Sequence, residues 1–256
     1  MTNAPAASQA LQVLGLLSRH TEPLPAVAIA RQLGLPRSST YHLLGVLQEH
    51  GFVVHLPEER RFGLGVAAFE LGSAFSRQAP LQRLARPVLT RLVDETRHNA
   101  HFAALHGVDV LYLVEERAPR RPSLVTDVGV RLPAHLTASG LAMRAALPPA
   151  QVRALYPARD ALVQRHGAGP TSLTQLRSAL PGVRPRGYAV EQGTVTPEFS
   201  SVAAAVLDHV GHPVAAVALT FEGSRVEPDE LGRLVTAVRS SAETLSRRIG
   251  RTAGSP

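Results

Sequence analysis

The sequence predicts an α+β protein of two parts. A small domain of three helices and a β-hairpin is followed by a larger domain with an antiparallel sheet flanked by helices. Apolar residues recur at helical spacing in the first 50 residues, and two short apolar runs around a polar turn come next. Further along, several short segments alternate with a period near two. The expected domains cover residues 1–65 and 81–250, joined by a linker helix at 66–80.

Three short helices are expected in the smaller domain. The first is suited to capping by Ser8, the second spans 26–33 and stops at Gly34, and the third spans 37–50. Apolar spacing assigns one face of each helix to a shared core. The residues expected there are Leu11, Leu14, Leu17, Val27, Ile29, Ala30, Leu33, Tyr41, Leu43, Leu44 and Leu47.

A hairpin is expected to complete this domain. Residues 52–56 and 61–64 are apolar runs on either side of the polar turn 57–60. Three small helices followed by a hairpin have the layout of a winged helix-turn-helix. The residues leave open one alternative, a small helical domain whose hairpin has no special role.

The rest of the chain mixes helical and strand-like patterns. Residues 66–78 keep helical spacing, interrupted only by Gly72, and are expected to link the domains. A helix at 172–180 is expected to end at Pro181, because proline lacks the backbone donor of a helix interior. Further helices are expected at 81–97, 137–147, 149–156 and 227–249, and strands at 101–106, 110–114, 123–125, 200–207 and 214–221.

Composition excludes several classes of protein. At 45% apolar and 18% charged, the chain has the composition of an ordinary globular protein. No run approaches the roughly 18 apolar residues that a membrane span needs, and residues 1–9 lack a signal-peptide pattern. We therefore expect a cytoplasmic protein without a membrane partner. Because cysteine is absent, disulfides, thiol nucleophiles and cysteine-based zinc sites are excluded.

The basic charge is not concentrated where DNA binding is expected. The formal charge of +7 comes from arginine alone, since the sequence has no lysine. Arginine suits phosphates and guanine edges. Residues 1–66, however, hold five arginines and four acids. Net charge by itself therefore does not indicate nucleic-acid binding.

Short polar side chains at the start of the third helix are candidates for DNA contact. The first residues of a recognition helix enter the major groove, where hydroxyl and guanidinium groups reach phosphates or base edges. Arginines at the hairpin tip suit contacts to the DNA backbone. The predicted DNA-binding residues are Arg37, Ser38, Ser39, Thr40, His42, Arg60 and Arg61. The alternative for both segments is a solvated polar surface.

Several segments carry a family resemblance that covers about Gln9 to Arg248. They are Ala30-Arg31-Gln32-Leu33-Gly34-Leu35-Pro36-Arg37-Ser38-Ser39-Thr40, Gly51-Phe52-Val53, Arg61-Phe62-Gly63-Leu64-Gly65, Ala85-Arg86-Pro87-Val88-Leu89, Asp94-Glu95-Thr96, Arg131-Leu132-Pro133-Ala134-His135-Leu136-Thr137-Ala138-Ser139-Gly140 and Arg186-Gly187-Tyr188-Ala189. In this order and spacing they resemble the IclR (isocitrate lyase regulator) family of bacterial transcription factors.

The resemblance implies a winged helix-turn-helix joined to a GAF-like effector domain, assembled as a homodimer or a dimer of dimers. Members of the family bind double-stranded operator DNA and respond to small metabolites, frequently carboxylic or aromatic acids. A helix N-terminus in their pocket binds the ligand carboxylate, as such termini suit anions. The positions that match the family's effector pocket are Ala138, Ser139, Glu191, Phe199, Ser201, Ala218 and Thr220.

Five positions depart from the family's usual residues. His42 stands in place of a common arginine, so base preference is expected to differ. Leu141, Glu198, Ser201 and Ala218 stand in place of a common lysine, glycine, cysteine and serine. The pocket therefore lacks some of the usual polar partners. A ligand that is larger or more apolar than a small keto acid is the resulting hypothesis.

No metal site, catalytic residue or cofactor is expected. His101 and His106 would lie on opposite faces of a strand, and adjacent Glu115 and Glu116 would also diverge. The glycine-rich segment 167–170 lacks a phosphate-loop lysine. Two other classes remain as alternatives: a protein-interaction module that uses the winged helix as a docking surface, and an enzyme built on the C-terminal domain.

The expected mechanism couples a ligand to DNA binding. Two recognition helices of a homo-oligomer would meet a pseudo-palindromic operator, with half-sites one helical turn or a multiple apart. A ligand in the C-terminal domain would change the spacing of the DNA-binding domains through the linker at residues 66–78.

Overall fold

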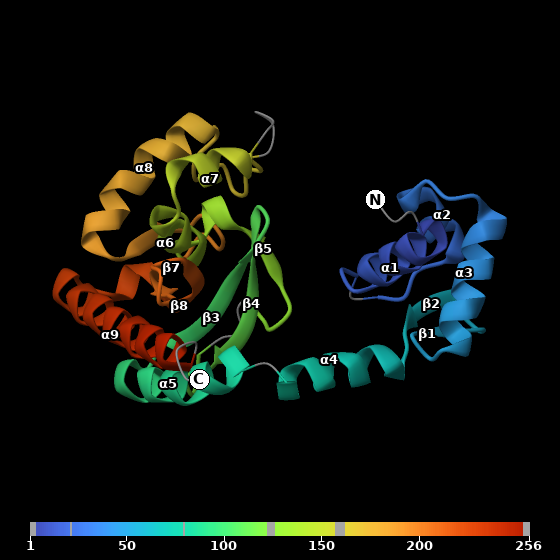
Figure 1. Ribbon diagram of the computed structural model, residues 1–256, viewed down its shortest axis with the longest axis horizontal. Helices are drawn as coiled ribbons and strands as arrows, with labels where there is room; N and C mark the ends of the chain where they lie inside the picture. Colours follow the sequence, from blue (N-terminus) through green and yellow to red (C-terminus); the bar gives the residue numbers. More distant parts are fainter. Residues whose placement is uncertain (1–3, 21, 79, 122–125, 157–161, 253–256) are drawn as a thin grey trace. The chain divides into compact units, whose positions relative to one another are not determined.

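The computed structural model describes residues 4–20, 22–78, 80–121, 126–156 and 162–252 (Figure 1). The chain divides into two compact units, residues 1–79 and 80–256. Each unit has its own buried hydrophobic residues.

The first unit contains α1 (Pro5–Leu17), α2 (Ala26–Leu33) and α3 (Arg37–Glu49), followed by β1 (Val53–Leu56), β2 (Arg61–Leu64) and α4 (Val66–Gln78). The two strands pair antiparallel, with Leu56 opposite Arg61 at the turn. Leu24 adds a bridge to Phe62 through two backbone hydrogen bonds of 2.8 and 2.9 Å. Gly34 ends α2 at a φ of 64°, a left-handed conformation that favours glycine and directs the chain into α3. This is the winged helix-turn-helix layout expected from the sequence.

The core of this unit differs in part from the expected one. Helix α1 begins at Pro5, before Ser8, because proline's fixed φ suits the first turn of a helix. Leu11 is 69% exposed while Val13 is fully buried. Residues two apart on a helix are separated by about 200° around its axis, so the two cannot share a face. The apolar residues Val27 and Tyr41 are also exposed, contrary to expectation.

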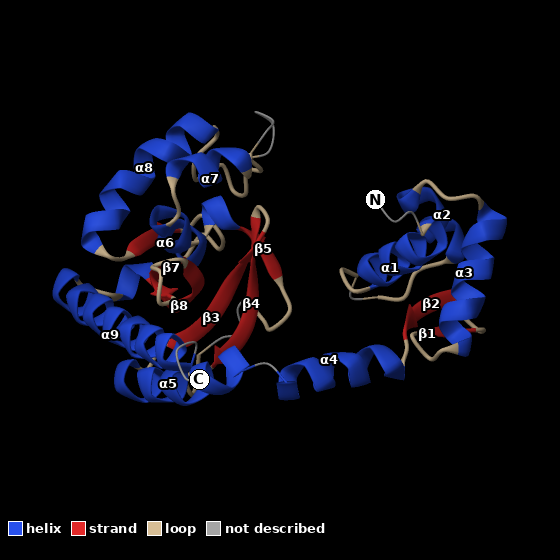
Figure 2. Cartoon of the chain, in the orientation of Figure 1, coloured by secondary structure: helices blue, strands red, loops and turns tan. Residues whose placement is uncertain are grey.

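The second unit is built on one six-stranded antiparallel sheet with the order β5-β4-β3-β8-β7-β6 (Figure 2). The strands are β3 (Asn99–His106), β4 (Asp109–Glu116), β5 (Arg131–Pro133), β6 (Ala189–Gln192), β7 (Phe199–Leu207) and β8 (Pro213–Glu222). The helices are α5 (Pro80–Thr96), α6 (Ala138–Ala146), α7 (Pro149–Ala154), α8 (Leu173–Arg186) and α9 (Pro228–Thr252). Figure 1 shows α5 and α9 together on one side of the sheet, with α6 and α8 on the other.

Strand alternation places buried hydrophobic clusters on both faces of the sheet. Successive residues of a strand point to opposite faces of the sheet. Val202 and Val217 therefore pack with α5 and α9, whereas their neighbours Ala203 and Ala218 pack with α6 and α8. The small side chains on the second face let α6 lie close to the sheet, where seven of its nine residues are buried.

The second unit differs from the expected one at the end of α8 and at the edges of the sheet. Helix α8 does not end at 180 but continues through Pro181 and Pro185 to Arg186. Leu176, Leu180 and Val183 are buried on one side of α8, and this burial continues past the first proline. The short edge strands β5 and β6 were not expected, because three or four residues carry little periodic signal. The strand expected at 123–125 lies outside the described residues.

We predict that Gly140→Ala destabilises the protein by about 1–3 kcal/mol or more, because an added Cβ would overlap the backbone carbonyl of Ala134. Gly232→Ala is the matched control, since it also lies inside a helix but its Cβ would meet nothing within 4 Å. Alanine there should raise stability by about 0.5–1 kcal/mol. Urea unfolding measures both, and equal effects of the two substitutions would refute the close approach.

Candidate DNA-binding surface and effector cavity

The first turn of α3 presents an exposed polar surface. Arg37, Ser38 and His42 are exposed, and Ser39 is half-buried. Pro36 precedes the helix and provides no side-chain cap. The first backbone N–H groups of the helix have no partner within it, so this turn is suited to binding an anion such as a phosphate.

Thr40 does not share this surface. Its side chain is fully buried, and its Oγ1 donates to the carbonyl oxygen of Pro36 at 3.0 Å. The predicted base or phosphate contact from Thr40 is therefore not available in this conformation. Tyr41, which was expected in the core, is instead 55% exposed and packs its ring edge-on against Phe62 at 6.5 Å. Sequence periodicity missed it, because an aromatic residue beside core leucines resembles a core position.

The two arginines of the hairpin are placed differently. Arg60 is exposed in the turn at a φ of 54°. Arg61 is half-buried, and its Nη1 donates to the carbonyl oxygen of Pro23 at 3.1 Å and lies 3.5 Å from Glu22 Oε2. Arg61 thus ties the hairpin to the loop before α2, while Arg60 remains open to solvent.

A small cavity in the second unit gathers six of the seven positions expected to bind an effector. These six are Ala138, Ser139, Glu191, Ser201, Ala218 and Thr220. Phe199 does not line the cavity. The remaining lining residues, which sequence reasoning missed as pocket residues, are His101, Tyr112, Thr126, Thr137, Val195 and Thr196.

Strand register explains why distant residues meet here. Glu191 in β6 pairs with Ser201 in β7, which pairs with Thr220 in β8. One row of polar side chains therefore crosses three strands on the face that α6 covers. His101 in β3 pairs with Ala218 in the same way. Alternation within 101–106 could have placed His101 on a face, but not opposite Ala218, because register depends on the pairing of strands far apart in sequence.

The N-terminus of α6 forms one wall of the cavity. Thr137 caps the helix, and its Oγ1 accepts a hydrogen bond from the N–H of Gly140 at 3.0 Å. The N–H groups of Ala138 and Ser139, in the first turn, receive no side-chain cap. Both residues are buried and line the cavity. A helix N-terminus carries a partial positive charge, so this wall suits the carboxylate of a ligand.

Glu191 is the acidic group of the opposite wall. Its Oε1 accepts from Ser201 Oγ at 3.0 Å, and its Oε2 lies 2.6 Å from Thr194 Oγ1. The Thr194 hydroxyl is also 2.6 Å from the carbonyl oxygen of Leu136, and it has one hydrogen for these two acceptors. A protonated Glu191 resolves the conflict by donating to Thr194. Burial raises the pKa of Glu191 despite its hydrogen bonds, which favours that protonated form.

His101 adds a neutral imidazole to the cavity. Its Nε2 lies 3.4 Å from Thr126 Oγ1, and its Nδ1 has no hydrogen-bond partner among the described residues. Burial, aided by the positive charge of Arg117, lowers the pKa of His101 from 6.5 to about 4. No arginine or lysine lines the cavity. An anionic ligand would thus rely on the amides of α6 rather than on a cationic side chain.

The cavity is compact. Its volume is about 20 Å³, enough for one or two water-sized groups. The expectation of a ligand larger than a small keto acid has no support in this conformation. Any organic acid would fit only if lining side chains such as Tyr112 or Val195 moved, and an aromatic acid would require the larger movement.

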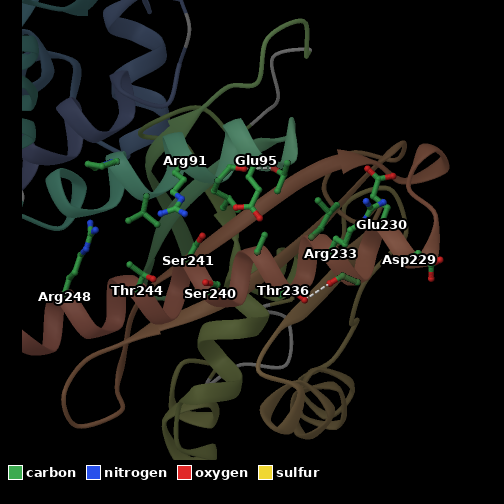
Figure 3. Close-up of a pocket in the computed structure, with 17 residues that line it drawn as sticks. Arg91, Glu95, Asp229, Glu230, Arg233, Thr236, Ser240, Ser241, Thr244 and Arg248 are labelled. Carbon is green, nitrogen blue, oxygen red and sulfur yellow. Dashed lines mark hydrogen bonds between the residues drawn. The ribbon is translucent and has the colours of Figure 1, made fainter.

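A larger groove of about 780 Å³ runs between α5 and α9 (Figure 3). Figure 3 shows Arg91 and Glu95 on one side and a row of serine and threonine side chains on α9 on the other. Charges of both signs line it, so it favours no one class of ligand. None of the residues expected to bind DNA or effector lies there.

Over the described residues, no cluster of three or more His, Cys, Asp or Glu side chains is suited to hold a metal ion. In that same part of the chain, no helix combines the length and the apolar character that a membrane span requires.

We predict that His101 makes stability sensitive to acid. The pKa of His101 in the folded state is about 4, below the ordinary 6.5. The contribution of the neutral imidazole to the free energy of unfolding is therefore complete above pH 6.5 and declines as the pH falls toward 4. When the pH is lowered from about 6.5 to about 4.5, the free energy of unfolding should therefore fall less for the His101→Gln variant than for the unmodified protein. Urea unfolding at both pH values measures the difference. Parallel pH dependences would contradict the assignment of a neutral buried imidazole.

Two family models match the chain. The model described as "Bacterial transcriptional regulator IclR C-terminal" matches residues 74–247, and the "IclR helix-turn-helix domain" model matches residues 6–57. The glycerol operon regulatory protein of Streptomyces coelicolor is 30% identical over 250 residues, which cover 97% of each chain.

Solved structures share the fold. A crystal structure of an IclR transcriptional regulator from Alicyclobacillus acidocaldarius has a TM-score of 0.85 at 24% identity, covering 96% of this chain and 99% of that one. An IclR homologue from Microbacterium hydrocarbonoxydans, complexed with 4-hydroxybenzoate, has a TM-score of 0.80 at 20% identity and covers 96% of this chain and 99% of its own.

Both structural units are therefore accounted for by one family. Its members regulate transcription and are not enzymes, so an enzyme on the C-terminal domain is no longer a candidate. The chain belongs to the IclR family of bacterial transcriptional regulators, with a helix-turn-helix DNA-binding domain and an effector-binding domain.

Proposed function

We propose that the protein binds a pseudo-palindromic operator as a homodimer or a dimer of dimers, and that a compact organic acid in the cavity beside α6 changes its affinity for that operator. The observation that supports the ligand most directly is the buried polar cavity, with a helix N-terminus on one wall and the Glu191 row on the other. The effect on DNA follows from the family membership of both domains.

The first turn of α3 supplies the DNA contacts. Arg37 and Ser38 are exposed there and reach phosphates or base edges, with His42 one turn further along. Arg60 in the hairpin turn contacts the DNA backbone. Thr40 and Arg61 act by holding the helix start and the hairpin in place, since their hydrogen bonds lie within the domain.

The ligand class follows from the two walls of the cavity. A carboxylate accepts hydrogen bonds from the amides of Ala138 and Ser139. At its other end the ligand needs a polar group that pairs with the Glu191, Ser201 and Thr220 row. The cavity of about 20 Å³ has to open for any organic acid, and a short aliphatic acid with an oxo or hydroxy group requires less opening than an aromatic acid. The 4-hydroxybenzoate of the Microbacterium homologue makes the aromatic class the necessary comparison.

Exposed apolar side chains support an oligomer. Leu11 in α1 and Val66, Phe69 and Leu71 in α4 are each between 63% and 74% exposed. Four large apolar side chains on two helices of one small domain suit burial against a second copy. A ligand-dependent change in the spacing of the paired domains, carried by α4, would then alter operator binding by a coupling of about 1–3 kcal/mol, or roughly 5- to 150-fold.

We predict that Arg37→Ala weakens operator binding by about 1–3 kcal/mol, because it removes a charge-assisted contact from the recognition helix. Fluorescence anisotropy with operator DNA at several salt concentrations measures this loss. If Arg37 contacts a phosphate, the slope of log affinity against log salt should also fall by about one. Arg83→Ala, an exposed arginine on α5, is the matched control. Normal operator affinity of Arg37→Ala would show that the recognition surface is wrongly assigned.

We predict that Ser139→Trp abolishes the response to effector while operator binding is kept, because indole fills the cavity. Calorimetric titration of the unmodified protein with glyoxylate, pyruvate and 4-hydroxybenzoate should show the strongest binding for a short acid. The variant should bind none of them in this cavity. Tighter binding of 4-hydroxybenzoate than of the short acids would reject the compact-ligand assignment, and an unchanged DNA response in the variant would reject the site.

A further inference from the structure

A second hollow lies at the opposite end of α6 from the effector cavity. It is a groove of about 520 Å³ lined by residues of α7 and α8 and of the C-terminal end of α6. Figure 2 shows these three helices near one another. This volume falls within the range of about 300–1,000 Å³ that is usual for small-molecule sites. None of its lining residues lines the effector cavity.

Arg144, near the end of α6, lines this groove and is the largest fully buried side chain of the described residues. Its guanidinium lies 4.6 Å from the ring centre of Tyr156, and Nη2 donates to the carbonyl oxygen of Gly107 at a long 3.4 Å. Its Nε and Nη1 donors have no partner, and it forms no ion pair with a described residue. A buried arginine stays charged, so it is costly without a partner.

The surroundings of Arg144 share this lack of partners. Eight buried side-chain atoms of the described residues have no hydrogen-bond partner, and four of them belong to Arg144, Tyr156 and His135. The Tyr156 ring contacts both of the other side chains. Burial lowers the pKa of His135, so its imidazole does not add a second charge at neutral pH. Asp109 lies near enough for its charge to favour the charged form of Arg144, but it forms no ion pair with Arg144, so the positive charge of the cluster is only partly compensated.

The groove itself combines positive charge with apolar surface. Arg177 and Arg184 of α8 join Arg144 in its lining, and no acidic residue is present there. Arg184 already donates to the carbonyl oxygens of Ala145 and Leu147, at 2.8 and 3.0 Å. Arg177 is exposed and makes no hydrogen bond or ion pair with a described residue.

Helix α8 gives the groove a rigid apolar side. Pro181 and Pro185 lie on its groove face, one turn apart. Their rings cannot change φ, so this wall keeps its shape when a ligand binds. Leu147 and Val152 add two further apolar side chains to the lining.

We propose that this groove is a second ligand site of the effector-binding domain, specific for a small organic anion. The acid group of the anion pairs with the exposed Arg177 at the rim and is attracted by the buried charge of Arg144 beneath it, and its apolar body lies against the prolines, Leu147 and Val152. Three arginines without an acid select for negative charge. The groove between α5 and α9, in which both signs are present, has no such preference.

The test separates this groove from the effector cavity. Benzoate and octanoate, with benzamide as the uncharged comparison, are titrated by calorimetry into the full-length Ser139→Trp protein, in which the cavity is filled. We expect both anions to bind and benzamide to bind at least about tenfold more weakly. Adding Arg177→Glu or Arg144→Met should weaken the anions by about tenfold or more. Arg153→Glu, an exposed arginine of α7 that does not line the groove, should change nothing.

Each outcome bears on the proposal. If neither anion binds the Ser139→Trp protein, or if Arg177→Glu and Arg144→Met leave binding intact, the second site is refuted. A change of oligomeric state on Arg177→Glu without loss of anion binding would instead assign the groove to contacts between subunits, and would also refute it. Ser201→Leu, which enlarges a half-buried side chain of the cavity wall on β7, replaces Ser139→Trp if the latter does not fold.

Discussion

The close packing of α6 against the sheet is the constraint on which the effector-binding unit depends. Gly140 allows the start of the helix to approach the backbone of Ala134, and the small side chains of Ala203 and Ala218 let it lie close to β7 and β8. With seven of its nine residues buried, α6 is fixed along its length. Its first turn then faces the polar row of the sheet, and its last turn borders the groove beneath α8. A larger side chain at the contact would displace both ends together.

The interior of this unit tolerates polar groups that most cores exclude. Burial raises the pKa of Glu191 and lowers the pKa of His101, so both shifts favour the uncharged form of the side chain. A neutral pair costs far less to bury than two unpaired ions. It also leaves donors and acceptors free for a ligand. Arg144 cannot be neutralised in this way, so its missing partners indicate a different solution, an anion from outside the chain.

The DNA-binding unit separates residues that hold the structure from residues free to make contacts. The side chains of Thr40 and Arg61 are committed to the backbone carbonyls of Pro36 and Pro23. Arg37, Ser38 and Arg60 are left exposed beside them. The sequence motif contains both kinds, and hydrogen bonds within the fold distinguish them. Tyr41 shows the reverse case, since it resembles a core residue in sequence and lies at the surface.

Local pattern determined much of this protein. The spacing of apolar residues, with glycine and proline at the ends of elements, predicted α2, α3, the hairpin and α4, because each of these elements depends on residues that are neighbours in sequence. The family motifs indicated six positions that line one cavity. Only the tertiary structure decided which face of α1 is buried, that α8 passes through two prolines, and that His101 lies opposite Ala218. These features rest on contacts between residues far apart in sequence, where the burial of a whole face outweighs local preference.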